Sequence, residues 1–217
     1  MYAKYVKRPL DFLLSLLGMV VLSPVFLVII IAIKLNSKGP VFFQQKRVGI
    51  RKSTFMMLKF RTMRIDAPHD TPTHLLEDPD AWITSTGKFL RKTSLDELPQ
   101  LLNILAGHMA VIGPRPALWN QYDLIAERDK YNANDVRPGL TGWAQINGRD
   151  ALEIPDKARY DGEYVNNISL GMDIKCFVGT IVSVLKNDGV VEGGTGRLHR
   201  KDAPVEAFDK QNLSEED

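Results

Sequence analysis

The hydrophobic and polar positions divide the chain into one long apolar segment and a series of shorter, mixed elements. Residues 12–33 contain no charge, and about 20 apolar residues are enough to cross a bilayer as a helix. Ser23 and Pro24 fall at the middle of this segment, where a proline removes a helical hydrogen bond, so we expect a kink or a break there. Two forms follow: a kinked helix that spans the membrane, or a helix-break-helix that enters and leaves on one side.

The flanks of this segment are basic on both sides. Lys4, Lys7 and Arg8 precede it, and Lys34 and Lys38 follow it. Unequal positive charge normally orients a spanning helix, so equal flanks fit the re-entrant form better. Proline is nevertheless tolerated in spanning helices, and the residues alone leave both forms open.

Arg8 and Asp11 stand just before the apolar segment. They are three positions apart and therefore neighbours on one face of a helix. The pair predicts either a contact with a lipid phosphate, in which Asp11 balances Arg8, or an anchor at the membrane interface.

Alternating and helical patterns predict the elements of the remaining chain. We expect strands over residues 40–49 and 53–63, and helices over residues 84–92, 117–131, 153–166 and 172–186. The apolar stripe of residues 172–186 is typical of a core helix, although it could also contact lipid or a second copy in a homodimer. The chain thus predicts a mostly helical α/β fold with a short β-hairpin, divided into membrane helices (1–38), one globular domain (39–187) and a flexible tail (188–217).

Composition and charge exclude several classes of protein. With 28 basic and 26 acidic residues the net charge is only +2, and no nucleic-acid-binding motif accompanies the basic clusters, so we expect no nucleic-acid partner. The single cysteine, Cys176, excludes an intramolecular disulfide and fits a reducing compartment. The four histidines show no zinc-binding spacing.

Two adjacent acids, Asp96 and Glu97, precede Pro99, which favours the first turn of a helix. Both acids would then lie at the positive end of that helix, where an ionised carboxylate or a transferring phosphate is stabilised. A simpler interpretation is a helix cap, because Ser94 and Glu97 match the capping-box pattern and Asp96 suits an N-cap. On this stretch alone the cap is favoured.

Three cations precede or flank the acidic pair. Lys59 and Arg61 alternate with apolar residues in the second predicted strand, so both should project from one face. Arg91 lies in the helix that ends just before the acids. The three could bind phosphate oxygens, although a solvated strand face is the commoner explanation for the spacing of Lys59 and Arg61.

Three further arginines follow the acidic pair. Arg115 stands between Pro114 and Pro116, which stiffen the backbone around a potential bidentate phosphate donor. Arg137 and Arg149 lie in a loop with three glycines, which would let the backbone approach a ligand closely. A tightly packed structural loop is the alternative for that segment.

Taken together, these stretches resemble the bacterial sugar transferase family, the monotopic polyprenyl-phosphate phosphoglycosyl transferases, over residues 2–189. The matching stretches are Lys7-Arg8 with Asp11, Ser23-Pro24, Gly39-Pro40-Val41-Phe42, Lys59-Phe60-Arg61-Thr62-Met63, Ser94-Leu95-Asp96-Glu97-Leu98-Pro99-Gln100-Leu101, Gly113-Pro114-Arg115-Pro116 and Arg137-Pro138-Gly139-Leu140-Thr141-Gly142. The compact length is similar to the small class of the family, which is exemplified by undecaprenyl phosphate N,N'-diacetylbacillosamine 1-phosphate transferase.

The resemblance implies a re-entrant helix broken at Ser23-Pro24, with the catalytic domain on the cytoplasmic face of the inner membrane. It also implies that Asp96 attacks the β-phosphorus of a UDP-sugar, expels UMP and forms a phosphosugar intermediate, from which polyprenyl phosphate takes the sugar phosphate. Mg²⁺ would be the cofactor, with Asp96 as its ligand, and Glu97 would assist in acid/base work or orientation. The implied donor is an N-acetylated amino sugar, although other hexoses stay open.

Two alternatives from other classes are a catalytically silent membrane scaffold for glycan assembly and a glycosyltransferase that releases UDP. The intact Asp96-Glu97 pair argues against the scaffold. The identity of the released nucleotide distinguishes the second alternative.

Overall fold

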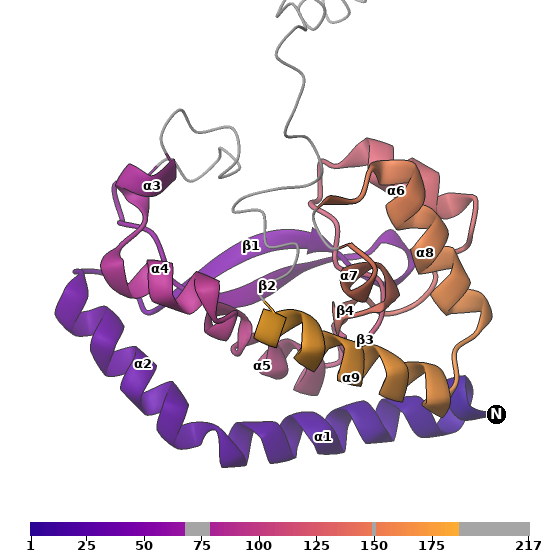
Figure 1. Cartoon of the computed structure of the whole chain (residues 1–217), viewed down its shortest axis with the longest axis horizontal. Coiled ribbons are helices and arrows are strands. Elements are labelled where there is room, and N and C mark those ends of the chain that lie inside the picture. Colours follow the sequence, from indigo (N-terminus) through magenta and orange to yellow (C-terminus); the bar gives the residue numbers. More distant parts are fainter. Residues whose placement is uncertain (68–78, 149–150, 187–217) are drawn as a thin grey trace, which may run out of the picture.

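The computed structural model describes residues 1–67, 79–148 and 151–186, and the fold within these ranges is mostly helical with two small sheets (Figure 1). This confirms the predicted α/β class. The predicted tail lies outside the described residues. In chain order the elements are η1 (Tyr2–Val6), α1 (Lys7–Val21), α2 (Ser23–Asn36), β1 (Phe42–Val48), η2 (Ile50–Lys52), β2 (Thr54–Phe60), α3 (Pro79–Trp82), α4 (Ser85–Lys92), η4 (Leu95–Glu97), α5 (Gln100–Leu105), β3 (Ala110–Ile112), α6 (Tyr122–Asp129), β4 (Gly139–Thr141), α7 (Trp143–Ile146), α8 (Ile154–Asn166) and α9 (Leu170–Lys186).

The N-terminal helices form a bent pair, as the Ser23-Pro24 sequence predicted. The axis turns by 61° between Tyr2–Val21 and Ser23–Asn36, and Pro24 occupies the first turn of α2, where its missing N–H leaves no bond unmade. The Ser23 hydroxyl donates to the carbonyl of Val20 (2.8 Å) at the end of α1. Within the described residues no single helix is long and apolar enough to cross a bilayer, whereas this bent pair is, judged by length and composition alone.

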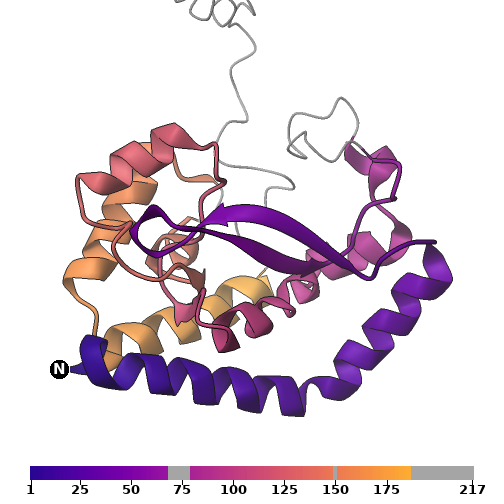
Figure 2. The ribbon, with the colours of Figure 1, turned by 180° about the vertical axis from the view of Figure 1, so that it is seen from behind.

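The globular part lies on the concave side of the bent pair, as both views of the ribbon show (Figures 1 and 2). β1 and β2 form the predicted antiparallel hairpin, in which Phe42 pairs with Phe60. β3 and β4 form a parallel pair that the sequence analysis did not predict, with Ala110 opposite Gly139. Each of these strands has only three residues, too few for an alternating pattern to be recognised.

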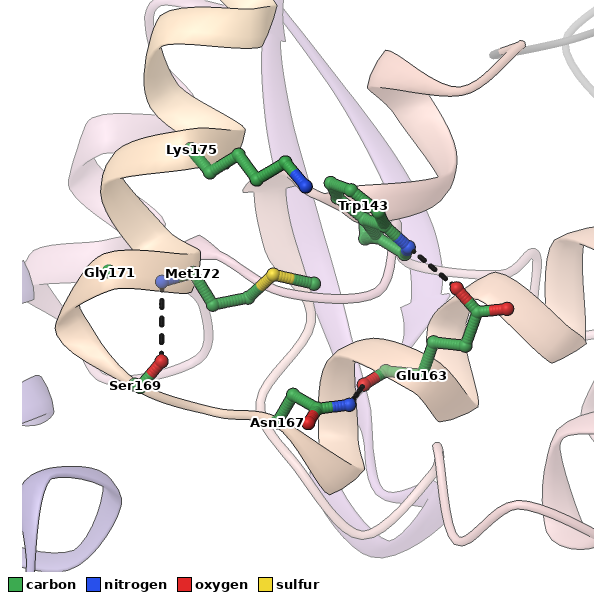
Figure 3. Close-up of a pocket in the computed structure, with 7 residues that line it drawn as sticks. All are labelled: Trp143, Glu163, Asn167, Ser169, Gly171, Met172 and Lys175. Atoms are coloured by element: carbon green, nitrogen blue, oxygen red, sulfur yellow. Dashed lines mark hydrogen bonds between the residues drawn. The ribbon is translucent and has the colours of Figure 1, made fainter.

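The C-terminal helices pack against β3 and border an open concavity. Tyr164 and Cys176 are buried there together with Ile112. The concavity between α7, α8 and α9 has a volume of about 600 Å³, and its lining residues are Trp143, Glu163, Asn167, Ser169, Gly171, Met172 and Lys175 (Figure 3). It includes neither member of the acidic pair.

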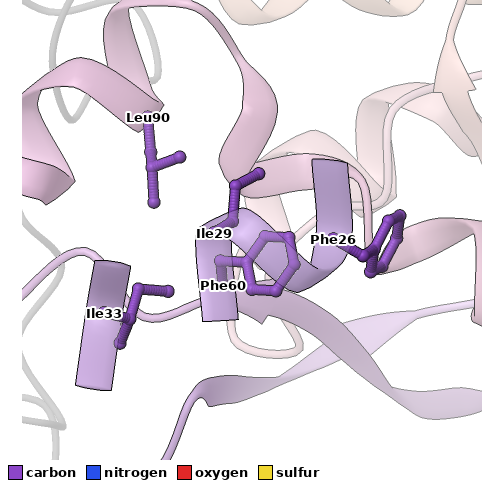
Figure 4. Close-up of a cluster of buried hydrophobic side chains, with 5 residues drawn as sticks. All are labelled: Phe26, Ile29, Ile33, Phe60 and Leu90. Atoms are coloured by element: carbon purple, nitrogen blue, oxygen red, sulfur yellow. The ribbon is translucent and has the colours of Figure 1, made fainter. Parts of the chain in front are cut away.

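One face of α2 is part of the hydrophobic core. Phe26, Ile29 and Ile33 of this helix pack with Phe60 of β2 and Leu90 of α4 (Figure 4). Burying side chains of this size contributes about 1.5–3 kcal/mol each. The opposite faces of α1 and α2 expose large apolar side chains, namely Phe12, Leu13, Leu14, Leu16, Leu17, Val20, Val21, Leu27, Val28, Ile31 and Leu35. On α9 the exposed apolar residues are Leu170, Ile174, Phe177, Val178, Ile181 and Val182.

Candidate active site

The acidic pair lies in the short 3-10 turn η4, and the interpretation of this stretch as a helix cap is wrong. α5 begins at Gln100 with Pro99 as its N-cap, so the helix starts later than we predicted. Ser94 makes no side-chain capping bond, and its φ of +56° is in the left-handed region, where the chain reverses out of α4. The carboxylates are therefore available for contacts outside their own turn.

Two cations from distant parts of the chain meet Glu97. The Lys59 Nζ of β2 donates to Glu97 Oε1 (2.7 Å), and the Arg115 guanidinium donates to both Glu97 oxygens, with the Nη1 to Oε2 distance at 3.2 Å. Lys59 Nζ is also 3.7 Å from Asp96 Oδ2, which is longer than a hydrogen bond. Asp96 is 8% exposed and keeps oxygen lone pairs for a further ligand.

The surroundings shift the pKa values of the two acids in opposite directions. Burial raises the pKa of Asp96 above its usual value, and the negative charge of Glu97 adds to this shift, while Lys59, Arg91 and Arg115 offset only part of it. Burial would also raise the pKa of Glu97, but the charges and hydrogen bonds of Arg115 and Lys59 outweigh burial and hold that pKa well below its usual range. Glu97 is thus a fixed anion that orients two cations, and it is unsuited to give or take a proton near neutral pH.

A buried amide in α5 fixes the strand that carries Lys59. Asn103 Oδ1 accepts from the backbone N–H of Leu58 (2.9 Å), and Asn103 Nδ2 donates to the carbonyl of Met56 (2.9 Å). The residue is 4% exposed. Asn103 is a functional residue that the sequence patterns above do not single out, although a polar side chain on the apolar stretch from Leu101 to Leu105 is a usable signal.

The structure brings some of the predicted cations to the acidic pair and separates others from it. Arg91 lies close enough to lower the pKa of Asp96, and its Nε donates to Thr62 Oγ1 (3.0 Å). Arg61 is instead buried at the end of α2, where it donates to the carbonyls of Lys38 (2.6 Å) and Ser37 (3.0 Å). The predicted face shared by Lys59 and Arg61 is wrong because the β1–β2 ladder ends at Phe60.

The other predicted residues occupy positions around α5 and α1. Arg137 Nε donates to the Gly107 carbonyl beyond the end of α5 (2.9 Å), and Arg149 lies outside the described residues. Arg8 and Asp11 contact the globular part: Arg8 Nη1 donates to the Ile104 carbonyl (2.7 Å), and Asp11 Oδ1 accepts from the Val111 N–H (3.0 Å).

The donor set at the acidic pair can be tested for a metal ion. No cluster of three or more potential metal-ligating side chains occurs among residues 1–67, 79–148 and 151–186. Mg²⁺, however, is commonly held by one or two carboxylates together with substrate phosphates and water. Asp96 fits that arrangement, because its carboxylate accepts no short hydrogen bond from Lys59, whereas Glu97 is already engaged by two cations.

Comparisons with known proteins give the chain a family. The model of the family described as "Bacterial sugar transferase" matches residues 2–187. The sugar transferase EpsL of Bacillus subtilis is 39% identical over 184 residues, covering 85% of this chain and 89% of the relative.

Several relatives carry the name UDP-glucose:undecaprenyl-phosphate glucose-1-phosphate transferase. The protein from Xanthomonas campestris is 39% identical over 182 residues (81% of this chain, 38% of the relative). The one from Escherichia coli is 40% identical over 186 residues (82% and 40%), so the chain matches about two fifths of each of these longer proteins. The chain therefore belongs to the bacterial sugar transferase family.

Proposed function

We propose that this protein transfers a sugar 1-phosphate from a UDP-sugar to polyprenyl phosphate, releasing UMP and giving a polyprenyl-diphosphate-sugar. The observation that carries the proposal is a buried carboxylate, Asp96, beside an anion, Glu97, that holds Lys59 and Arg115 at the same place. Relatives named for glucose-1-phosphate transfer to undecaprenyl phosphate support it.

The chemistry divides one transfer between two anions into two steps. An Asp96 oxygen attacks the β-phosphorus, the bond from this phosphorus to the bridging oxygen breaks, and UMP leaves with that oxygen. A phosphate oxygen of polyprenyl phosphate then attacks the same phosphorus, and Asp96 leaves as a free carboxylate. Covalent catalysis of this kind suits a carboxylate, which is already ionised at neutral pH and needs no base to activate it.

The cations at the site would compensate the charge of the diphosphate. Lys59 and Arg115 are held within reach by Glu97, and the charge of Arg91 acts on Asp96. Preorganised cations of this kind stabilise the charge that develops on a transferring phosphoryl group. When bound, Mg²⁺ would supply further charge neutralisation at the phosphate oxygens, with Asp96 as its protein ligand.

The membrane carries one of the two proposed substrates. A polyprenyl chain stays in lipid, so the enzyme must bind its phosphate at the membrane surface. The exposed apolar faces of α1 and α2 are suited to a re-entrant insertion, which would leave the globular part on the cytoplasmic face. We therefore propose that the acidic pair lies at that membrane surface.

The identity of the donor sugar is the most specific part of the proposal. The names of the relatives make UDP-glucose the first donor to test. A UDP-linked N-acetylated amino sugar, which the resemblance to the small class implies, is the second.

The test is nucleotide release by detergent-solubilised protein supplied with Mg²⁺, polyprenyl phosphate and a panel of UDP-sugars, with UMP resolved from UDP. We expect UMP with one donor class, and an Asp96→Asn variant that releases none. Release of UDP would identify a glycosyltransferase and contradict the Asp96 mechanism. A folded Asp96→Asn protein that still supports glycan assembly would favour the scaffold.

A further inference from the structure

The first turns of α1 contact α5, which follows the acidic pair, and β3, which precedes Arg115. Arg8 places one guanidinium at the C-terminal end of α5, with Nη1 2.7 Å from the Ile104 carbonyl and Nη2 3.3 Å from the Leu105 carbonyl. A helix leaves its last carbonyls without intrahelical partners, and its negative end favours a cation. Arg8 therefore caps α5 from a different part of the chain.

The helix that Arg8 caps is joined rigidly to the acidic pair. Backbone hydrogen bonds run from Leu98 to Leu95, from Leu101 to Leu98 and from Leu102 to Pro99, so η4 continues into α5 without a flexible link. α5 has six residues and is about 9 Å long at 1.5 Å per residue. A displacement of its C-terminal end would thus be transmitted to Asp96.

Asp11 holds the other side of the site in the same way. Its Oδ1 accepts from the Val111 N–H (3.0 Å), which points away from the edge of β3 that pairs with β4. Only Gly113 and Pro114 separate the end of β3 from Arg115, the partner of Glu97. Asp11 is 5% exposed, so the contact is shielded from water.

A network of partly buried polar groups fixes the start of α1. Lys7 Nζ lies 2.7 Å from Asp173 Oδ2 in the first turn of α9 and 3.7 Å from Asp11 Oδ1. The hydroxyls of Tyr2 (2.6 Å) and Tyr164 (2.7 Å) donate to the two oxygens of the same Asp173 carboxylate. The first turns of α1 are therefore held in one place and can serve as a reference for α5 and β3.

We propose that Arg8 and Asp11 are positioning residues: Arg8 sets the place of Asp96 through α5, and Asp11 sets the place of Arg115 through β3. The inference rests on the proposed function and replaces the expectation that this pair binds a lipid phosphate. Because both half-reactions pass through Asp96, loss of either contact slows the first half-reaction, which involves no lipid substrate. A misplacement of about 1 Å can cost on the order of 10²-fold in rate.

The experiment measures UMP release in a single turnover without polyprenyl phosphate, and then kcat and KM for polyprenyl phosphate with the donor saturating. The variants are Arg8→Ala, Arg8→Lys, Asp11→Ala and Asp11→Asn. We expect Arg8→Ala to slow the single turnover by about 10- to 100-fold, with KM for polyprenyl phosphate unchanged. Arg8→Lys and Asp11→Asn should be milder than the alanine variants, because lysine can still reach one carbonyl and asparagine keeps the oxygen that accepts from Val111.

Arg128→Lys is the matched control. Arg128 is buried and pairs with Asp161 through contacts of 2.6 and 2.8 Å between α6 and α8, and it touches neither α5 nor β3 in these contacts. Its substitution should lower the melting temperature while leaving UMP release per folded molecule unchanged.

Three outcomes would contradict the inference. A normal single turnover with a raised KM for polyprenyl phosphate would make Arg8 a lipid-phosphate contact. If UMP release by Arg8→Lys falls only in proportion to its folded fraction, as expected for Arg128→Lys, the role of Arg8 is only structural. If the wild-type protein releases no UMP with any donor, the proposed function itself fails and the positioning role with it.

Discussion

Asp96 and Glu97 are neighbours in the chain, yet their surroundings move their pKa values in opposite directions. Paired titratable groups whose environments separate their pKa values commonly take different roles in one reaction. Here Arg115 and Lys59 stabilise Glu97 as an anion and lower its pKa, whereas burial raises the pKa of Asp96 and nearby cations offset only part of that shift. This difference supports the proposal that Asp96 makes the nucleophilic attack and that Glu97 orients the cations.

The raised pKa of Asp96 predicts the acidic limb of activity. Only the ionised carboxylate is nucleophilic, so kcat/KM for the UDP-sugar should fall as the pH drops through a value above the usual 3.8 of an aspartate. In Glu97→Gln a neighbouring negative charge is gone, so the limb should shift to lower pH, and misplaced cations should lower the plateau by on the order of 10²-fold. The dependence of kcat/KM on pH, measured for the wild type and for Glu97→Gln, tests the shift of the acidic limb and the lower plateau. An acidic limb at the same pH in both proteins would contradict the effect of the Glu97 charge on the pKa of Asp96.

The same shift predicts a stability effect for Asp96→Asn. A group whose pKa is higher in the folded state stabilises the protein below its unfolded pKa, and this stabilisation is lost as the pH rises through the folded value. At neutral pH the ionised Asp96 therefore costs stability, and a neutral isostere should gain about 0.5–2 kcal/mol while activity falls more than about 10³-fold. Melting temperatures against pH check this: the advantage of Asp96→Asn should grow with pH, and a destabilised variant would contradict it.

At the scale of elements, local sequence predicted which segments are helices and strands better than where they end. Pro99 correctly indicated a helix beside the acids, but the 3-10 turn and the reversal at Ser94 placed the start of α5 at Gln100. Such boundaries depend on tertiary contacts, because Glu97 is drawn to Lys59 and Arg115 from distant segments. A pattern within one segment contains no information about these partners.

The contact between β2 and α5 gives a prediction at this scale. Asn103→Leu removes both partly buried hydrogen bonds to β2 and leaves the Leu58 N–H and the Met56 carbonyl without these partners, at up to about 1–3 kcal/mol each. We expect a lower melting temperature and slower transfer, because Lys59 follows Leu58 directly. Asn36→Ala, which removes an exposed hydrogen bond to Ser85, is the control and should change little; equal melting temperatures in the two variants would contradict the role of Asn103.

For the whole molecule, the residues alone could not choose between a spanning and a re-entrant segment: the equally basic flanks fit the re-entrant form better, but proline is tolerated in spanning helices. The structure adds contacts that favour the re-entrant form. The start of α1 is joined to α5 and β3 through Arg8 and Asp11, and α2 is joined to β2 and α4 through the cluster of Figure 4. Residues 1–38 and 39–187 thus share a core, and their division into separate domains stays a prediction.

Membrane topology follows from these contacts and can be tested directly. Because both helices of the bent pair contact the same globular part, inserting one end across a bilayer would drag polar residues of that part into lipid, at several kcal/mol for each unsatisfied group. Single cysteines at Ala3 and Lys38, both exposed, should therefore react with an impermeant thiol reagent only from the cytoplasmic side, whereas one at Val21, beside the break, should be protected in the bilayer. Cys176 is buried and should give little background. Reaction of Ala3→Cys and Lys38→Cys from opposite sides would mean that the bent pair spans the membrane, and that the contacts made by Arg8, Asp11 and Phe60 rearrange there.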